Sequence, residues 1–169
     1  MSRQADTDFA QAVVDSLAFV REAGRLSGQF AIAALGRMAD SLASDAGSLK
    51  CLVQGEMDQD GSSFLILAVS GTLQLRCQRC LESMAFALQI DKRLLLVAPG
   101  GPWPDDALED DGSDAIEASK ALALLPLIEE EVLLALPIAP RHEVCAPPVV
   151  MDKDREPSAF AVLAQFRKH

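Results

Sequence analysis

The chain has few of the residues on which many catalytic sites depend. It contains no tyrosine, one tryptophan and two histidines, and one of the histidines is the terminal residue, His169. This scarcity argues against a Ser/His/Asp triad, which needs a histidine held between two partners. Neither a Walker-type phosphate loop nor a GxGxxG motif occurs. The sequence therefore offers no recognised catalytic arrangement, and we expect a protein that is not an enzyme and has no small-molecule substrate.

Long apolar runs are missing as well. A membrane-spanning helix needs about 18 or more consecutive apolar residues, and the longest candidate here, residues 94–97, stops before Pro99. Residues 1–15 carry acidic side chains without the charged-then-apolar layout of an export signal. We therefore expect no membrane contact and a cytoplasmic location, where the four cysteines would be reduced thiols or metal ligands rather than disulfides.

The formal net charge of −10 is distributed unevenly. Between residues 99 and 131 ten acidic side chains are opposed only by Lys120, so this segment carries −9 and the remainder about −1. Prolines and glycines at 99–102 mark a break, and the pattern predicts a solvated acidic loop over residues 99–118. Because the remainder is nearly neutral, the global charge does not exclude a nucleic-acid partner.

Alternating apolar residues predict a sheet in the middle of the chain. The pattern indicates strands at 24–32, 49–57, 64–75 and 84–97, with a turn at 58–61 and a bulge or close approach at Gly71. Helical spacing appears at 9–20, at 33–43 and towards 135, where Ser119 is a candidate cap and Pro126 favours a start near itself. These elements predict an α+β fold: an antiparallel meander or small barrel-like sheet with a few packing helices.

No internal repeat or second core is apparent. We expect an N-terminal segment at 1–18, a single α+β domain at 19–145 that includes the acidic loop, and a tail at 146–169. Ser158 is a candidate cap for a short helix within that tail, Ala159–Lys168.

Two pairs of metal-ligating residues have the same spacing. Cys77 and Cys80 are separated by two residues, and so are His142 and Cys145. Three cysteines and one histidine suit a closed, tetrahedral structural Zn²⁺ site. The 61 residues between Cys80 and His142 exceed the usual zinc-finger separation, so the fold would have to bring the two pairs together.

Two alternatives to zinc remain open at this point. The thiols can be ordinary cysteines, as we expect for Cys51, which stands alone at the start of a predicted strand. Cys77 and Cys80 can also form the redox pair of a thiol oxidoreductase, although a thioredoxin-like pair lies where a strand meets a helix. Here predicted strands flank the pair on both sides.

Four segments resemble one known family. They are residues 69–82 around the first cysteine pair, 127–137, 140–145 and 157–166. Their sequences and their order are similar to those of the YceD-like large ribosomal RNA subunit accumulation proteins, over a stretch from about residue 19 to the C-terminus. The resemblance implies a bacterial or organellar protein that supports 23S ribosomal RNA accumulation and large-subunit assembly. It carries over no catalytic residue, and it maps both metal-ligating pairs onto positions of the family.

The resemblance leaves the direct partner open between ribosomal RNA and a large-subunit ribosomal protein. The two ligand pairs would form a zinc knuckle. Basic side chains that could flank this knuckle and contact phosphate are Arg76, Arg79, Lys92, Arg93 and Arg141. The acidic loop could instead hold a basic ribosomal protein. The enzyme alternative is a thiol oxidoreductase acting through the first cysteine pair, or a nuclease, for which no carboxylate cluster lies on a rigid element. Nothing in the sequence indicates the oligomeric state.

Overall fold

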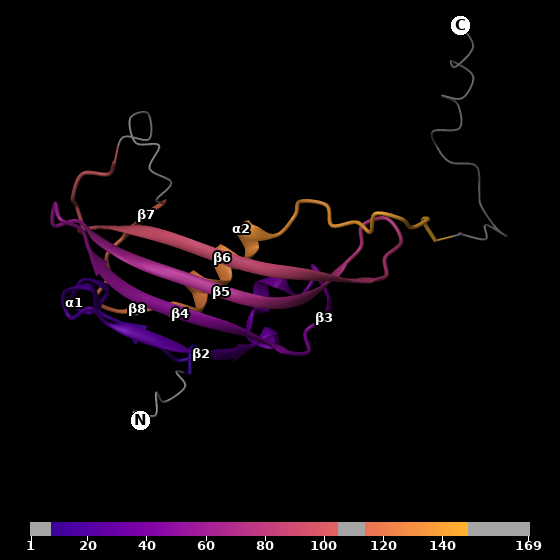
Figure 1. The fold of residues 1–169 in the computed structure, drawn as a ribbon, viewed down its shortest axis with the longest axis horizontal. Coiled ribbons are helices and arrows are strands. Elements are labelled where there is room, and N and C mark those ends of the chain that lie inside the picture. Colours follow the sequence, from indigo (N-terminus) through magenta and orange to yellow (C-terminus); the bar gives the residue numbers. More distant parts are fainter. Residues whose placement is uncertain (1–7, 105–113, 149–169) are drawn as a thin grey trace, which may run out of the picture.

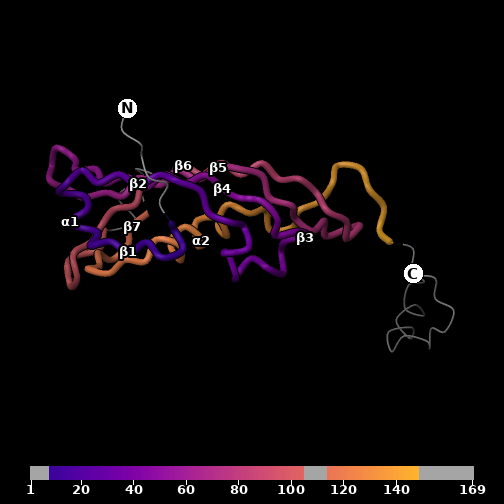
Figure 2. The backbone as a smooth tube through the Cα atoms, turned by 90° about the horizontal axis from the view of Figure 1, so that it is seen from below, coloured from indigo at the N-terminus to yellow at the C-terminus, as the bar shows by residue number. Residues whose placement is uncertain are grey.

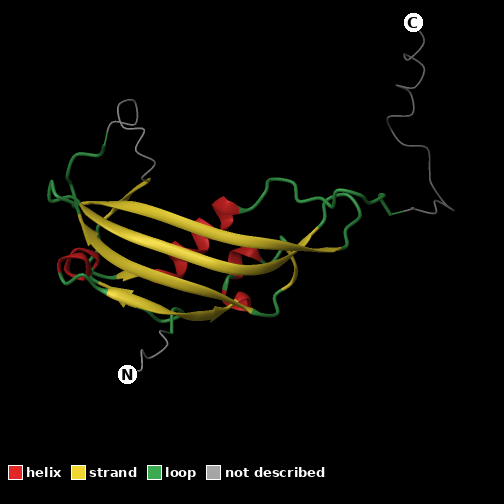
Figure 3. Cartoon of the chain, viewed as in Figure 1, coloured by secondary structure: helices red, strands yellow, loops and turns green. Residues whose placement is uncertain are grey.

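The computed structural model describes residues 8–104 and 114–148 of the chain. The predicted α+β class is confirmed, with a mixed sheet and two α-helices (Figure 3). The elements in order are β1 (Val13–Val14), α1 (Ser16–Arg21), β2 (Arg25–Ala31), the 3₁₀ turns η1 (Ile32–Ala34) and η2 (Gly36–Met38), β3 (Leu42–Ser44), β4 (Ser48–Met57), β5 (Ser63–Arg76), β6 (Ser83–Val97), β7 (Asp114–Glu117), β8 (Leu122–Ala123) and α2 (Leu124–Ala135).

The main sheet has the strand order β2-β4-β5-β6-β7 (Figure 1). The predicted meander is confirmed, because β4, β5 and β6 pair antiparallel in sequence order. β5 and β6 stay in one register from the pair Phe64–Leu95 to the pair Arg76–Ser83. Gly71 causes no bulge; instead, a Cβ there would lie 2.5 Å from Leu49 Cδ2, so the close approach is the correct reading.

Two layers enclose the core. Figure 2 shows β2, β4, β5 and β6 on one side of the molecule and α2 with β1 on the other. Along the strands, the side chains that face α2 are buried and alternate with more exposed ones. The core holds fully buried leucines from β4, β5 and β6 together with residues of α2 and the 3₁₀ turns: Leu49, Leu65, Leu67, Leu73, Leu75, Leu94, Leu124, Ile128, Ile32, Leu35 and Met38.

Helix α2 is placed by its apolar stripe and by one buried carboxylate. Leu124, Ile128 and Val132, spaced by four residues, are 0 % exposed and pack onto the sheet. On the neighbouring face the Arg37 N–H donates a 2.7 Å hydrogen bond to Glu129 Oε1, so this side chain ties η2 to the helix. Glu131 is also buried, at 6 % exposure.

Three expected helices differ from the structure. Residues 9–20 form only α1, which Asp15 caps by accepting from the Ala18 N–H, while Val13–Val14 pairs with β8. Residues 33–43 form two 3₁₀ turns and lead into β3, because tertiary packing outweighs a short helical pattern. Helix α2 begins at Leu124 with Ala123 at its cap position, so Ser119 does not cap it, whereas Pro126 lies in the first turn as expected.

The acidic segment contains a strand that the sequence did not predict. Asp114–Glu117 forms β7, which pairs parallel to Leu94–Val97 and makes the sheet mixed rather than wholly antiparallel. The C-terminal helix predicted at Ala159–Lys168 lies outside the described residues. Within the described ranges, no helix is long and apolar enough to cross a membrane.

Replacing Gly55 by alanine should destabilise the fold. A Cβ at this position of β4 would lie 2.6 Å from Val20 Cα and 2.8 Å from the Phe19 carbonyl oxygen, both in the backbone, so α1 would have to move. We expect Gly55→Ala to lower the free energy of unfolding by about 1–3 kcal/mol in a urea titration. Gly36→Ala is the control, because a Cβ there meets nothing within 4 Å. Equal stability of the two variants would contradict the packing of α1 on β4.

Candidate metal centre

Cys77 and Cys80 lie in the tight connection between β5 and β6. The Cys77 N–H donates to the Glu82 carbonyl, and the Leu81 N–H donates to the Cys77 carbonyl, both at 2.9 Å. Leu81 adopts a left-handed conformation, with φ of 65°, which closes the turn directly after the second cysteine. The hairpin end therefore holds both thiols on one short loop.

The second pair reaches this loop through the segment that follows α2. Residues 136–148 run from the end of α2 to the β5–β6 hairpin end, as Figures 1 and 2 show. The Gln78 N–H donates a 2.8 Å hydrogen bond to the Pro140 carbonyl and fixes the segment beside the hairpin. His142 follows two residues after Pro140 and faces Cys80. Cys145 lies three residues beyond His142 and faces Cys77.

The four predicted ligands are brought together in space. Their ligand atoms all lie within 4.8 Å of one another. Cys77 Sγ is 3.7 Å from Cys145 Sγ, and Cys80 Sγ is 3.3 Å from His142 Nδ1. Zn–S bonds of about 2.3 Å in a tetrahedron imply an S–S separation of about 3.8 Å, which the Cys77–Cys145 distance matches. Cys77 is buried and the other three are partly buried, so this group could hold a metal ion.

The protonation balance of the thiols also suits a cation. Burial raises the pKa of Cys77, but hydrogen bonds from the backbone of Cys80, Arg79 and His142 outweigh it and lower that pKa to about 5. The backbone of Glu82 lowers the pKa of Cys80, yet burial and the adjacent sulfurs of Cys77 and Cys145 raise it overall. The backbone thus favours the thiolate form of Cys77, whereas burial and the neighbouring sulfurs disfavour the thiolate form of Cys80. A divalent cation bound here would stabilise both thiolates.

Arg79 connects the two halves of the cluster. Its Nε donates to Cys145 Sγ at 3.0 Å, and its Nη2 donates to the His142 carbonyl at 2.9 Å. The bond to Cys145 raises the pKa of the guanidinium further above its usual range. A positive charge against a ligand sulfur both orients that sulfur and offsets the negative charge of three thiolates around one dication.

The comparison with family models identifies the family of the chain. The model described as Large ribosomal RNA subunit accumulation protein YceD matches residues 65–167, which is more than half of the chain. This chain belongs to the YceD family. The matched range begins in β5 and includes all four cluster residues, and it confirms the family that the sequence segments indicate. No solved structure matches the chain.

The structure separates the five basic residues predicted to flank the knuckle. Arg76 and Arg141 are exposed at the hairpin end, and Arg79 is used within the cluster. Lys92 and Arg93 lie far along β6, opposite Leu67 and Ile66 of β5, so the expectation that they flank the knuckle is wrong.

Both distant basic residues have acidic partners. Lys92 Nζ lies 2.7 Å from Asp114 Oδ2, and this hydrogen bond raises the pKa of the lysine. Arg93 Nη2 lies 3.1 Å from Asp58 Oδ2 and 3.5 Å from Glu56 Oε1, and its guanidinium lies 3.5 Å from the centre of the Phe64 ring. Their charges are therefore already balanced within the chain.

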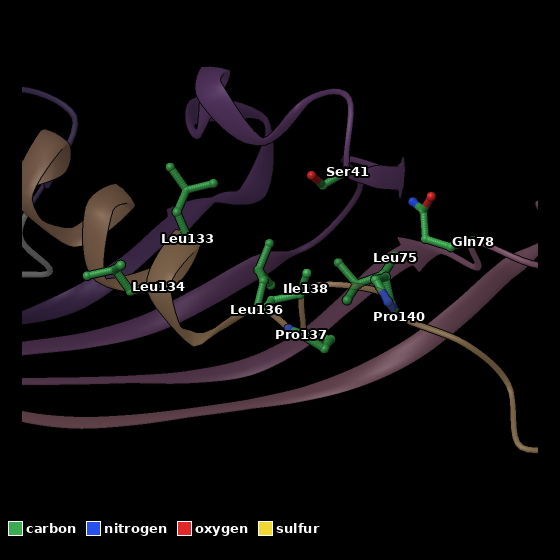
Figure 4. A pocket seen from close by; sticks show the side chains of 9 residues that line it. All are labelled: Ser41, Leu75, Gln78, Leu133, Leu134, Leu136, Pro137, Ile138 and Pro140. Carbon is green, nitrogen blue, oxygen red and sulfur yellow. The ribbon is translucent and has the colours of Figure 1, made fainter.

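An apolar cavity of about 370 Å³ lies next to the cluster. Figure 4 shows its lining from the end of α2 and the segment after it, from the chain before β3, and from the end of β5. The lining residues are Ser41, Leu75, Gln78, Leu133, Leu134, Leu136, Pro137, Ile138 and Pro140. Since Gln78 and Pro140 belong both to this lining and to the hydrogen bond that fixes the ligand segment, the cavity is continuous with the cluster's scaffold.

Cys51 and two glutamates of α2 are buried outside the cluster. Cys51 lies in the core, and burial raises its pKa to about 12, in agreement with the expected core role. The sequence pattern did not lead us to predict that Glu129 and Glu131 are buried. The available signal was their position on α2, directly adjoining the buried stripe of Ile128 and Val132.

Removing Arg79 should weaken metal binding without removing a ligand. We expect Arg79→Ala to reduce the zinc affinity about tenfold to a hundredfold, the usual effect of losing a partner of a metal ligand. Competition with a chromogenic chelator would measure the affinity. Arg76→Ala is the matched control, because Arg76 is exposed on the same hairpin and should leave the affinity unchanged. Equal affinities for the two variants would contradict the role assigned to Arg79.

Proposed function

We propose that this protein is a non-catalytic, cytoplasmic factor that supports 23S ribosomal RNA accumulation by binding a component of the nascent large ribosomal subunit. The family match supports a role in accumulation of the large-subunit RNA. The α+β scaffold supports a binding role. It presents one long sheet to a partner, together with a hairpin end that is held by the segment after α2.

The proposed metal is a structural Zn²⁺ held by Cys77, Cys80, His142 and Cys145. Four protein ligands leave no open coordination position for a substrate or a reactive water. The ion would lock the segment after α2 onto the β5–β6 hairpin. The alternative of a thiol oxidoreductase receives less support, because the cysteine pair lies between two strands and not at a strand–helix junction.

Charge supports a basic ribosomal protein as the direct partner. The chain carries a net charge of −10. Of the five basic residues considered for phosphate contact, Arg79, Lys92 and Arg93 make hydrogen bonds or ion pairs within the chain. This use of the cations is the observation that carries the proposal, because only Arg76 and Arg141 of these five remain exposed for phosphate contact. Large-subunit RNA would then be affected through one of its proteins.

A direct RNA contact is the second candidate. Arg76 and Arg141 are both exposed at the hairpin end. Two exposed arginines on a rigid, metal-tied loop could reach one or two phosphates.

Capture from dissociated large subunits distinguishes the two candidates. We expect the immobilised protein to retain a basic ribosomal protein after nuclease treatment, and the double variant Arg76→Ala/Arg141→Ala to retain it equally. Mass spectrometry of the bound fraction, repeated from low to high salt, would identify the partner. If nuclease removes all captured material and the double variant captures nothing, RNA is the direct partner, and the salt dependence would be steep.

A further inference from the structure

One edge of the main sheet is open in the part of the chain that the structure describes. β6 is paired on its outer side only over Leu94–Val97, where β7 runs alongside. Among the described residues, none pairs its backbone with Ser83–Arg93 on that side (Figure 1). Natural sheets block such edges with proline, bulges, charged side chains or covering segments. This stretch contains no proline, keeps an unbroken register with β5 and carries charge only at Asp91, Lys92 and Arg93, so among the described residues nothing blocks the outward N–H and C=O groups of Ser83–Ile90.

A pocket of about 220 Å³ lies directly beneath this edge. It is lined by consecutive residues of β6 and by the C-terminal half of α2: Gln89, Ile90, Asp91, Lys92, Glu131, Leu134 and Ala135. A cavity of about 150 Å³ can hold a benzene molecule, so the space suits one long side chain. Because four neighbouring residues of the strand form one wall, a chain paired with β6 would pass across the pocket mouth.

The pocket contains a buried carboxylate that lacks a donor. Glu131 is 6 % exposed, and its Oε2 accepts no hydrogen bond from the described part of the chain. The nearest cation, Lys92, already donates to Asp114 at 2.7 Å. Burial raises the pKa of Glu131, and Lys92 opposes the rise. A buried acceptor without a partner costs about 1–3 kcal/mol, and a donor that entered the pocket would recover it.

The charge around the pocket selects a cation. Asp91, Asp114 and Glu130 lie near Glu131, and they are opposed by Lys92. A phosphate would be repelled here, whereas a lysine or arginine side chain would supply the missing donor and the missing charge. In a strand paired with β6, every second side chain points to the face covered by α2, where the pocket lies.

We propose that the open edge of β6 binds an extended, basic peptide segment, with a lysine or arginine of that segment seated in the pocket against Glu131. Backbone hydrogen bonds to Ser83–Arg93 supply affinity, and the pocket supplies specificity for the basic residue. The inference rests on the proposed function, since it names the part of a basic large-subunit protein that this factor would hold. A protein arm of alternating basic and β-branched residues is the chemistry that fits.

Synthetic peptides test this binding mode directly. The probe is a fluorescent peptide of about nine residues in which lysine alternates with valine, titrated with the full chain and followed by fluorescence anisotropy. Glu131→Gln should weaken binding about tenfold or more, since it replaces a charge-assisted hydrogen bond by a neutral one. Glu22→Gln is the matched control: it removes the same charge at an exposed position that neither lines the pocket nor belongs to the charges around Glu131, and binding should be nearly unchanged.

Two further peptides separate backbone pairing from simple attraction between charges. The same peptide with alternate backbone nitrogens methylated keeps its charge but cannot pair as a strand, so it should not bind. The same peptide with glutamate in place of lysine should not bind either. Hydrogen exchange should show new protection at 83–93 with the first peptide and not with the methylated one.

Several outcomes would overturn the proposal. Equal weakening by Glu131→Gln and Glu22→Gln would show nonspecific attraction, and tight binding of the methylated peptide would exclude strand pairing. Protection of 83–93 without peptide, together with dimers in sedimentation, would show that a second copy of this chain occupies the edge. Competition of the peptide by an RNA oligonucleotide would assign the edge to nucleic acid. If no peptide binds while the protein still captures a ribosomal protein, the edge proposal fails and the proposed function stands.

Discussion

The long antiparallel pairing of β5 with β6 is the constraint on which the other features depend. Its register, unbroken from Phe64–Leu95 to Arg76–Ser83, fixes where each end of the hairpin lies. At one end the connection holds the first cysteine pair. Along its length the inward leucines receive α2, and the chain after α2 is thereby directed back to the hairpin end. Beyond the short β7, no described residue pairs with the outer side of β6, which lies over the Glu131 pocket. A shift of register by one residue would reverse every side chain of β6 and remove all of these features together.

Two places along the hairpin share one electrostatic problem, negative charge without a sufficient cation. At the cysteine end, three sulfurs and one imidazole gather beside a single arginine, and the charge that the thiolates would carry calls for a cation that a metal can supply. Near the other end, Glu131 is buried without a donor, and the adjacent lysine is already paired. The first deficit suits a permanent structural ion. The second suits a cationic side chain that comes and goes with a partner. A scaffold stabilised by the structural ion could therefore hold the pocket at Glu131 in a fixed geometry.

The sequence predicted those features that depend on local pattern. Alternation in 49–57, 64–75 and 84–97 predicted the meander because one face of each strand is buried, and ligand spacing predicted the four residues that the fold brings together. It did not predict β7, whose four residues have no pattern of their own and are held by long-range parallel pairing. Nor did it predict that Lys92 and Arg93 lie far from the cysteine cluster. Both residues are on β6, and the length of this strand separates them from the hairpin end. The buried glutamates were missed because three consecutive glutamates point to different helix faces, and only the packing of α2 shows which of these faces are buried.

Zinc K-edge X-ray absorption on the protein as purified, without chelators and under reducing conditions, tests the central claim most directly. The account predicts about one zinc per chain with three sulfur ligands at about 2.3 Å and one nitrogen at about 2.0 Å. His142→Ala should lose the nitrogen contribution or the metal itself. A protein that contains no metal and has four freely titratable thiols would contradict the account, and so would a zinc ion bound without sulfur.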